Sequence, residues 1–255
     1  MEYAVVSVPA APVRRKPNHR KEMVNQLLFG EMVKVLRTKG SLWVKVRSLH
    51  DGYEGWTTNT LLEQVDKATA TARCEHVTTD MLSLLKAGER RMQIPTGSSL
   101  PFFSNGTGWL GTTEFTVEGR WINRLVQKPG AASLESLVMP WLNAPYLWGG
   151  RTPLGVDCSG FTQIIFKQLG FDLPRDAWQQ AQEGKAVQKF ADVHTGDLAF
   201  FNNKEDIVHV GILLDGGRII HASGKVKIDK IDKKGLIDAA TGERLLSLKA
   251  VRRIW

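Results

Sequence analysis

The first half of the sequence is a series of short apolar runs interrupted by turn residues, and this pattern limits the possible folds more than any other feature. Four runs carry it: AVVSV at 4–8, LLFGEMVKVL at 27–36, LWVKVRSL at 42–49 and GYEGWTT at 52–58. Residues 31–36 alternate with a period of two, and runs this short are typical of strands rather than helices. We therefore expect a small β-barrel over residues 1–66.

A looser version of this pattern continues over residues 67–126. A polar segment, DKATATARCEH, reads as a linker or entry strand, and LPFFSNGTGWLGT contains strand and turn candidates, so we expect a second, diverged β-barrel. The character then changes to helical spacing in SLESLVMPWLNAPYLWGG. There we expect Ser133 to cap a helix that Pro140 kinks or ends, and we place a third domain at residues 127–255.

Composition excludes several classes of protein. The 255 residues are 42% hydrophobic and 24% charged, without periodic glycines, which excludes disordered, collagen-like and repeat proteins. No apolar run reaches about 18 residues, so we expect no transmembrane segment. The net charge of +8 is spread along the chain without a nucleic-acid motif, so we expect no nucleic-acid partner. Residues 1–65 hold ten Lys or Arg against six Asp or Glu, which suits either an anionic wall polymer or a solvated face.

The beginning of the sequence has no basic leader ahead of its short apolar stretch, since Arg14 and Arg15 come afterwards. That order is the reverse of a secretory signal. We therefore expect a cytoplasmic protein, or a periplasmic or extracellular one if a leading segment has been removed from the sequence. We also expect a monomer.

Only two cysteines are present, Cys74 and Cys158. They are too few for a disulfide framework and lack metal-ligand spacing, so we expect no metal site. A cysteine is most often a small buried hydrophobic residue, and we keep that interpretation for Cys74. Cys158 is flanked by Asp157, Ser159 and Gly160, which are polar or very small and suit core packing poorly. Cys158 is therefore our candidate nucleophile.

The segment around Cys158 predicts a helix. Apolar residues in DCSGFTQIIFKQLG fall at helical spacing, and Gly170 stands where a C-terminal cap belongs. Asp157 or Ser159 is a natural N-cap, which places Cys158 in the first turn. There, unpaired N–H groups and the helix dipole stabilise a thiolate and lower the pKa of the thiol. The same N–H groups could also hold an oxyanion.

Two of the six histidines lie in HVGILLDGGRIIHAS, which predicts a β-hairpin closed by Asp-Gly-Gly. If all three turn residues form the loop, Leu214 pairs with Arg218, and His209 and His221 become diagonal neighbours on one face, roughly 7–8 Å apart at the backbone. A two-residue turn would put them on opposite faces. Thiol catalysis needs a base and a group that orients it, and a second imidazole can be that group. We assign His209 as the base and His221 as its orienting residue, with two structural histidines as the alternative.

Five motifs in order resemble one known family: DCSGF at 157–161, LPRD at 173–176, GDLAFF at 196–201, HVGI at 209–212 and IIHAS at 219–223. Their order and spacing are similar to those of the NlpC-type cell-wall peptidases. The resemblance implies a papain-like α+β domain, a triad of Cys158, His209 and His221, and no metal or organic cofactor.

The segment Tyr146-Leu147-Trp148-Gly149-Gly150 also resembles the family pattern. The resemblance implies that Tyr146 donates its hydroxyl to the oxyanion site, with a core aromatic residue as the alternative. Trp148 is expected to form a wall of the substrate cleft.

The first β-barrel, with GEMVKV and GYEGW, resembles a bacterial SH3-like domain. Two such modules ahead of this peptidase domain resemble the γ-D-glutamyl-L-diamino acid endopeptidases that trim murein peptides. In that subgroup an acidic residue of the first module receives the free ammonium of the N-terminal L-Ala. Glu22 and Tyr53 occupy matching places, and Asp157 and Ser159 would bind substrate near the nucleophile. Glu22 could equally be a surface charge.

One position departs from the subgroup, because Ala177 follows LPRD where a substrate-binding serine is common. This puts one polar substrate contact in doubt. We expect Arg175 and Asp176 to support the cleft or to pair with each other.

The implied reaction is hydrolysis of the γ-D-glutamyl-diamino acid bond of murein stem peptides with a free N-terminal L-Ala, in cell-wall recycling or remodelling. One alternative is a thiol amidase or acyltransferase acting on another wall substrate. A second is a wall-binding SH3-like protein whose peptidase domain is inactive. The complete set of Cys158, His209 and His221 speaks against the second.

Overall fold

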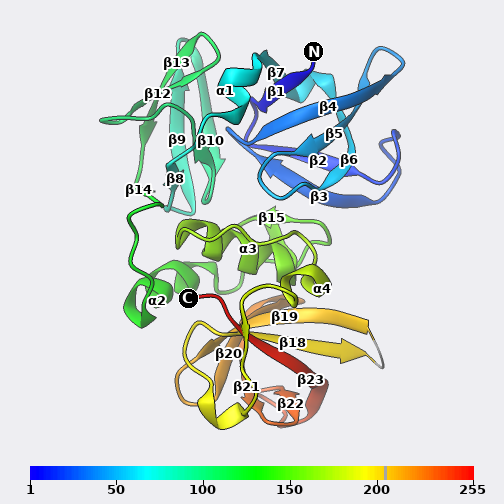
Figure 1. Ribbon diagram of the computed structural model, residues 1–255, viewed down its shortest axis with the longest axis vertical. Coiled ribbons are helices and arrows are strands. Elements are labelled where there is room, and N and C mark those ends of the chain that lie inside the picture. The colour runs from blue at the N-terminus through cyan, green and yellow to red at the C-terminus, as the bar shows by residue number, and fades with distance from the viewer. Residues whose placement is uncertain (204–205) are drawn as a thin grey trace. The chain divides into compact units, whose positions relative to one another are not determined.

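The computed structural model describes residues 1–203 and 206–255, which form two compact units (Figure 1). The N-terminal unit contains Met1–Gln127 together with the loop Trp148–Pro153, and the C-terminal unit contains Lys128–Leu147 and Leu154–Trp255. The limits at residues 66 and 126 that we drew from the sequence stay a prediction.

The N-terminal unit begins with the predicted SH3-like β-barrel. Its strands are β1 (Tyr3–Val6), β2 (Ala10–Arg14), β3 (Met23–Leu28), β4 (Met32–Lys39), β5 (Trp43–Ser48), β6 (Glu54–Thr58) and β7 (Leu62–Val65), with a 3-10 turn, η1 (Asn59–Leu61), before β7. They form one antiparallel sheet in the order β3-β2-β6-β5-β4-β1-β7. Alternate aliphatic residues such as Val33, Val44 and Val46 are buried inside it, as a period of two requires.

The second part of this unit is also built from short strands. They are β8 (His76–Thr78), β9 (Leu82–Ala87), β10 (Arg90–Pro95), β11 (Ser99–Leu100), β12 (Thr107–Leu110), β13 (Thr113–Glu118) and β14 (Trp121–Asn123). Two sheets, β10-β9-β13-β12 and β11-β8-β14, enclose a core of Leu85, Ile94 and Phe115 that also includes Phe29 of the first barrel. The polar segment before β8 is a short helix, α1 (Lys67–Thr71), capped by Asp66, and not the extended linker or strand that we expected.

The C-terminal unit combines helices with a closed barrel. Its helices are α2 (Ala131–Val138), α3 (Cys158–Gln168) and α4 (Ala177–Gln180), with 3-10 turns η2 (Met139–Trp141) and η3 (Phe190–Asp192). Its main strands are β18 (Leu198–Asn203), β19 (Asp206–Leu214), β20 (Arg218–Ser223), β21 (Lys225–Asp232), β22 (Gly235–Ile237) and β23 (Arg244–Arg253). These strands close into a ring because β22 pairs with both β21 and β23, and β17 (Lys185–Ala186) extends the sheet beside β23. A short strand, β16 (Gly155–Val156), precedes α3, whereas β15 (Arg151–Thr152) is part of the loop that belongs to the N-terminal unit.

The ends of two helices test our sequence predictions. The N-cap of α2 is Gly130, so our choice of Ser133 was wrong; the Ser133 hydroxyl lies one turn inside and bonds back to the Gly130 backbone. At the end of α3, Gly170 has φ +95°. Its N–H bonds to Lys167 and the next N–H bonds to Phe166, which together form a Schellman motif, the predicted glycine cap.

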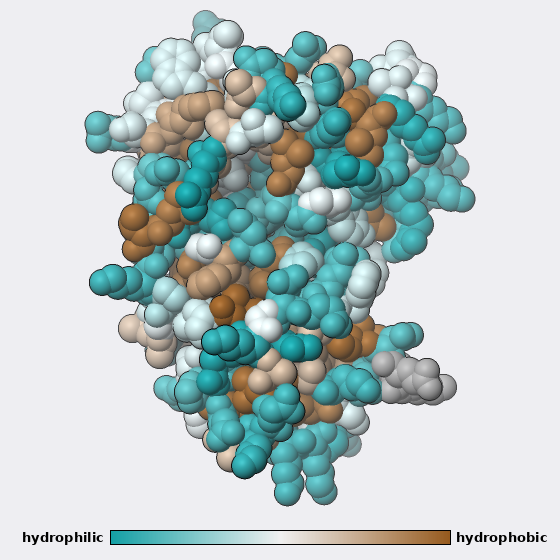
Figure 2. All heavy atoms as spheres, viewed as in Figure 1, coloured by the Kyte–Doolittle hydropathy of each residue, from teal (hydrophilic) through white to brown (hydrophobic). Residues whose placement is uncertain are grey.

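No helix in the described part of the chain is long and apolar enough to cross a membrane. On the face drawn in Figure 2, hydrophilic residues cover most of the surface and the hydrophobic residues form small separate patches.

Candidate active site

Cys158 is the first residue of α3, as predicted. Asp157 is the N-cap, and its carboxylate accepts a hydrogen bond of 2.7 Å from the N–H of Gly160. The thiol is 6% exposed, and its surroundings are polar: the backbone N–H groups of Ser159 and Val210 donate to the sulfur. Because Val210 directly follows His209, the sulfur lies beside the part of β19 that carries the predicted base.

The predicted pKa of the thiol was wrong in direction. Burial and the neighbouring carboxylate of Asp157 raise the pKa of Cys158 to about 12, and the N–H groups of Val210 and Ser159 lower it too little to compensate. The helix dipole is worth about 1 kcal/mol near a surface, whereas burial can shift a pKa by several units. The resting thiol is therefore protonated, and its proton must be removed during attack.

The two histidines lie together, as predicted. Leu214 pairs with Arg218 and Ile212 with Ile220, which is the register of a three-residue turn. Nε2 of His209 is 2.8 Å from Nδ1 of His221, with the rings nearly perpendicular at 85°. The diagonal placement that we derived from the turn thus brings both imidazoles to one face of the hairpin.

Both imidazoles are neutral in the resting protein. Burial, together with the neighbouring His221 and Lys227, lowers the pKa of His209 to about 3. Burial also lowers the pKa of His221, although Asp229 opposes the shift. A neutral His209 can accept a proton, which is what a general base requires.

Tyr146 lies near the thiol. Burial, then the neighbouring Cys158 and Asp157, raise the pKa of Tyr146 to about 12, so the phenol keeps its proton and can donate a hydrogen bond. Its backbone N–H bonds to the carbonyl of Gly224 at 3.0 Å, which fixes the segment against the end of β20. These contacts suit the predicted oxyanion role, which stays a prediction.

Sequence reasoning missed the partner of Arg175. Its guanidinium donates to the carboxylate of Asp157 at 2.6 Å and to the hydroxyl of Ser159 at 2.9 Å, and its side chain is 2% exposed. Asp176 instead caps α4, and Ala177 is the first residue of that helix. Arg175 therefore stabilises the start of α3 by binding Asp157 and Ser159. A substrate-binding role for these two residues stays a prediction.

Sequence reasoning also missed Asp229, whose carboxylate is 3.0 Å from Nε2 of His221. Asp229 is on β21, which pairs with β20 so that His221 faces Lys227 and Ile219 faces Asp229. The sequence contained a signal that could have found Asp229. If a second hairpin turns at Ser223 and Gly224, counting the register from that turn places Asp229 diagonal to His221.

The remaining predicted residues lie in the N-terminal unit. Nε1 of Trp148 donates to the carboxylate of Glu22 at 2.9 Å, so the structure brings these two candidates together. Arg15 pairs with the same carboxylate at 2.5 Å. Trp148 is 60% exposed. Tyr53 is half-buried just before β6, and its backbone N–H donates to the side chain of Asp51 at 3.0 Å.

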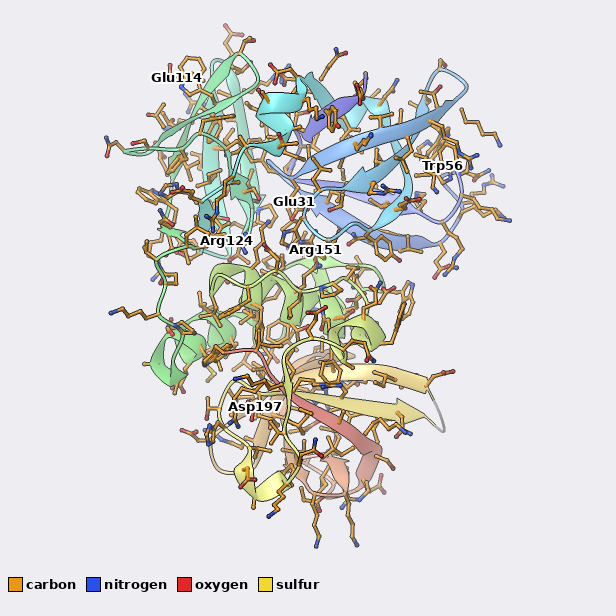
Figure 3. The ribbon with its side chains drawn as sticks, in the orientation of Figure 1. Glu31, Trp56, Glu114, Arg124, Arg151 and Asp197 are labelled. Atoms are coloured by element: carbon orange, nitrogen blue, oxygen red, sulfur yellow. The ribbon has the colours of Figure 1, made fainter. Side chains whose placement is uncertain are left out.

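The loop that carries Trp148 is fixed to the first barrel. Gly149 has φ +77°, and a Cβ there would lie 2.7 Å from the carbonyl oxygen of Met23. The backbone N–H of Arg151 donates to the side chain of Gln26 at 2.8 Å. The guanidinium of Arg151 binds both carboxylate oxygens of Glu31, at 2.8 and 2.9 Å, and Figure 3 shows these two side chains pointing toward one another.

No group of three or more His, Cys, Asp or Glu side chains suited to hold a metal ion occurs among residues 1–203 and 206–255.

Comparison with known proteins agrees with this geometry. Residues 143–244 match the NlpC/P60 family, and residues 13–60 match the bacterial dipeptidyl-peptidase SH3 domain. The chain is 34% identical to the γ-D-glutamyl-L-lysine dipeptidyl-peptidase of Bacillus subtilis, over 77% of this chain and 71% of that protein. It is 29% identical to the enzyme of the same name from Bacillus cereus, over 88% of this chain and 75% of that protein.

The fold has a close counterpart among solved structures. The crystal structure of an NlpC/P60 family protein from Bacillus cereus has a TM-score of 0.83 at 24% identity and covers 99% of both chains. The solved structure shows the fold, and the Bacillus subtilis relative together with the two family matches establishes that the chain is a cysteine peptidase of the NlpC/P60 family.

Proposed function

We propose that this protein hydrolyses the γ-D-glutamyl-diamino acid bond of murein stem peptides that have a free N-terminal L-Ala. The observation that supports it most is a helix-start cysteine whose sulfur accepts a hydrogen bond from the N–H of Val210, the residue after His209, while His209 is hydrogen-bonded to His221 at 2.8 Å. The two relatives named γ-D-glutamyl-L-lysine dipeptidyl-peptidase supply the substrate class.

The first step is attack by the sulfur of Cys158 on the γ-D-glutamyl carbonyl carbon. The thiol is protonated at rest, so its proton passes to His209 as the C–S bond forms. Nδ1 of His209 receives this proton, because its Nε2 is bonded to His221. The negative charge on the carbonyl oxygen is stabilised by the hydroxyl of Tyr146 and a backbone N–H at the start of α3.

The second step releases the diamino acid. The C–N bond breaks while His209 returns its proton to the leaving amine, which leaves a thioester on Cys158. His209 then removes a proton from water, the resulting hydroxide attacks the thioester, and the thiol is restored with its proton. The products are L-Ala-D-Glu and a peptide that begins with the diamino acid.

Recognition of the free amino terminus is assigned to Glu22. A hydrogen bond from Arg15 leads the interactions that lower the pKa of Glu22, so the carboxylate is ionised at neutral pH. Trp148 fixes the orientation of the carboxylate through its indole N–H. An ionised, oriented carboxylate suits a substrate ammonium, and a hydrogen bond to such a charged group contributes about 1.5–3 kcal/mol.

The test uses L-Ala-γ-D-Glu-L-Lys and its diaminopimelate counterpart, each with a free and with an acetylated N-terminus. Mass spectrometry should show cleavage after the γ-linked glutamate, and Cys158→Ala should abolish it. Acetylation and Glu22→Gln should each lower kcat/KM about 10–150-fold, the equivalent of 1.5–3 kcal/mol, and the two losses should not add.

Glu54→Gln is the matched control, because Glu54 is another glutamate of the same barrel that pairs with cations, Lys45 and Arg47. It should leave cleavage unchanged. Equal cleavage of acetylated and free peptides would remove Glu22 from the proposal. Release of a different product by an enzyme with a reactive Cys158 would assign it as an amidase or acyltransferase.

A further inference from the structure

We propose that Asp229 is a positioning residue that fixes the tautomers of both His221 and His209, so that the base presents an unprotonated nitrogen to the thiol. The inference rests on the proposed roles of these histidines in peptide hydrolysis. It concerns a residue six positions beyond the recognisable IIHAS motif, on a different strand.

The carboxylate of Asp229 is held firmly in place. The residue is 3% exposed, and one carboxylate oxygen is 3.0 Å from Nε2 of His221. The other oxygen accepts a hydrogen bond of 3.0 Å from the backbone N–H of Ala239. Lys227 lies 2.8 Å from Asp229 and 3.1 Å from Asp238, so the buried negative charge has a cation beside it.

This carboxylate is ionised at neutral pH. Burial by itself raises the pKa of Asp229, but hydrogen bonds from Lys227, Ala239 and His221 together outweigh burial and lower it. An ionised carboxylate can only accept hydrogen bonds. Nε2 of His221 must therefore carry the proton of that bond.

The direction of each following hydrogen bond is then determined. A neutral imidazole has one N–H and one acceptor nitrogen, so Nδ1 of His221 can only accept. The group opposite it, 2.8 Å away, is Nε2 of His209, which must donate. Nδ1 of His209 is left as the acceptor, and that is the nitrogen the proposed mechanism uses. Without a fixed acceptor at Asp229, the chain of hydrogen bonds could run in either direction.

Asp229→Asn is the sharpest test, because it keeps the size of the side chain and replaces one oxygen by an NH2 donor. The change is made in a Lys227→Met background, because the ammonium of Lys227 binds the same carboxylate oxygen as His221 and would hold the amide oxygen there. Without it, the amide oxygen can keep the bond from Ala239, and the NH2 then faces His221 and donates to Nε2. Nδ1 of His221 would then donate to His209, whose proton would move to Nδ1 and block the base. We expect kcat to fall about 10²–10⁴-fold with KM nearly unchanged, the range for loss of general-base catalysis.

Asp238→Asn is the matched control. Asp238 binds the same Lys227, but the hydrogen bonds of its side chain go to Lys227, Ala240 and Thr241 and not to His221. It should leave kcat within about threefold of the unchanged protein. Thermal unfolding of both variants measures any loss of stability separately from catalysis.

A direct readout does not depend on peptide cleavage. In ¹⁵N NMR spectra of the resting protein labelled at histidine, His209 and His221 should both be protonated at Nε2, and in the Asp229→Asn variant both at Nδ1. Unchanged tautomers in the variant, or a kcat within threefold of the unchanged protein, would overturn the proposal. If the variant does not fold, a proton on Nδ1 of His221 in the unchanged protein would overturn it alone.

Failure of the proposed function would look different. The unchanged protein would then show the expected tautomers and yet leave the γ-glutamyl bond of the test peptides intact.

Discussion

Replacing Arg151 by methionine should destabilise the N-terminal unit by about 3–5 kcal/mol, the usual cost of leaving one partner of a buried ion pair alone. The side chains of Arg151 and Glu31 are 0% and 1% exposed, and two short hydrogen bonds join them. A second carboxyl group is affected. Burial raises the pKa of Asp51, but the charge of Arg151 is the main influence that lowers it. Loss of the guanidinium therefore removes a cation that stabilises both the buried carboxylate of Glu31 and the half-buried Asp51.

The matched change, Glu31→Gln, should cost less than Arg151→Met. Glutamine keeps an oxygen for the N–H of Leu28, which bonds to Glu31 at 3.0 Å, and Asp51 remains to compensate the charge of Arg151. The double variant contains neither charge of the pair. The stability loss of the double variant should fall short of the sum of the two single losses by about 2–3 kcal/mol, because the Glu31 charge is then absent together with the guanidinium and only Asp51 still loses that cation.

The assay is urea unfolding of the full chain followed by tryptophan fluorescence, combined with hydrogen exchange over residues 26–31 and 148–153. The exchange data assign the transition to the N-terminal unit. A loss below about 1 kcal/mol for Arg151→Met, or additive losses in the double variant, would refute the argument from burial.

Three further changes test the C-terminal unit. Because burial and the neighbouring His221 and Lys227 lower the pKa of His209 from 6.5 to about 3, the unfolded chain binds a proton between these pH values that the folded chain does not. Stability should fall as pH drops below 6.5, by up to about 1.4 kcal/mol per pH unit, and His209→Gln should flatten urea midpoints measured from pH 4 to 7; parallel curves would contradict this. Gly211→Ala should cost about 1–3 kcal/mol in thermal unfolding and reduce cleavage, since its Cβ would lie 2.9 Å from the Cβ of His221; unchanged stability would argue against this crowding. Arg175→Met should cost about 3–5 kcal/mol because it removes the cation that binds the buried carboxylate of Asp157, with Arg175→Lys in between; equal stabilities of the two variants would exclude the ion pair as the cause.

The parts of the site that the sequence predicted correctly depend on local signals. The N-cap at Asp157 and the glycine cap at Gly170 define α3 and place Cys158 at its start. The Asp-Gly-Gly turn sets the register of the hairpin, and a period of two then decides on which face His209 and His221 lie. Each of these depends on residues within a few positions of one another.

Other features depend on atoms from distant parts of the chain. A local feature was also predicted wrongly: we expected Ser133 to cap α2, and the N-cap is Gly130. From the sequence we expected Arg175 to support the cleft or to pair with its neighbour Asp176. In the fold it binds Asp157, which is 18 positions away in the chain.

By itself, the sequence determined that Cys158 starts a helix and that His209 and His221 share one face of a hairpin, because a helix start and a tight turn are specified by side chains near to them in the chain. Only the tertiary structure decided the protonation states of these side chains. Desolvation depends on every atom packed around a group, so the pKa of Cys158 lies above its ordinary value although the helix dipole acts in the opposite direction. The carboxylate of Asp229 likewise reaches His221 only because β20 and β21 pair in one particular register.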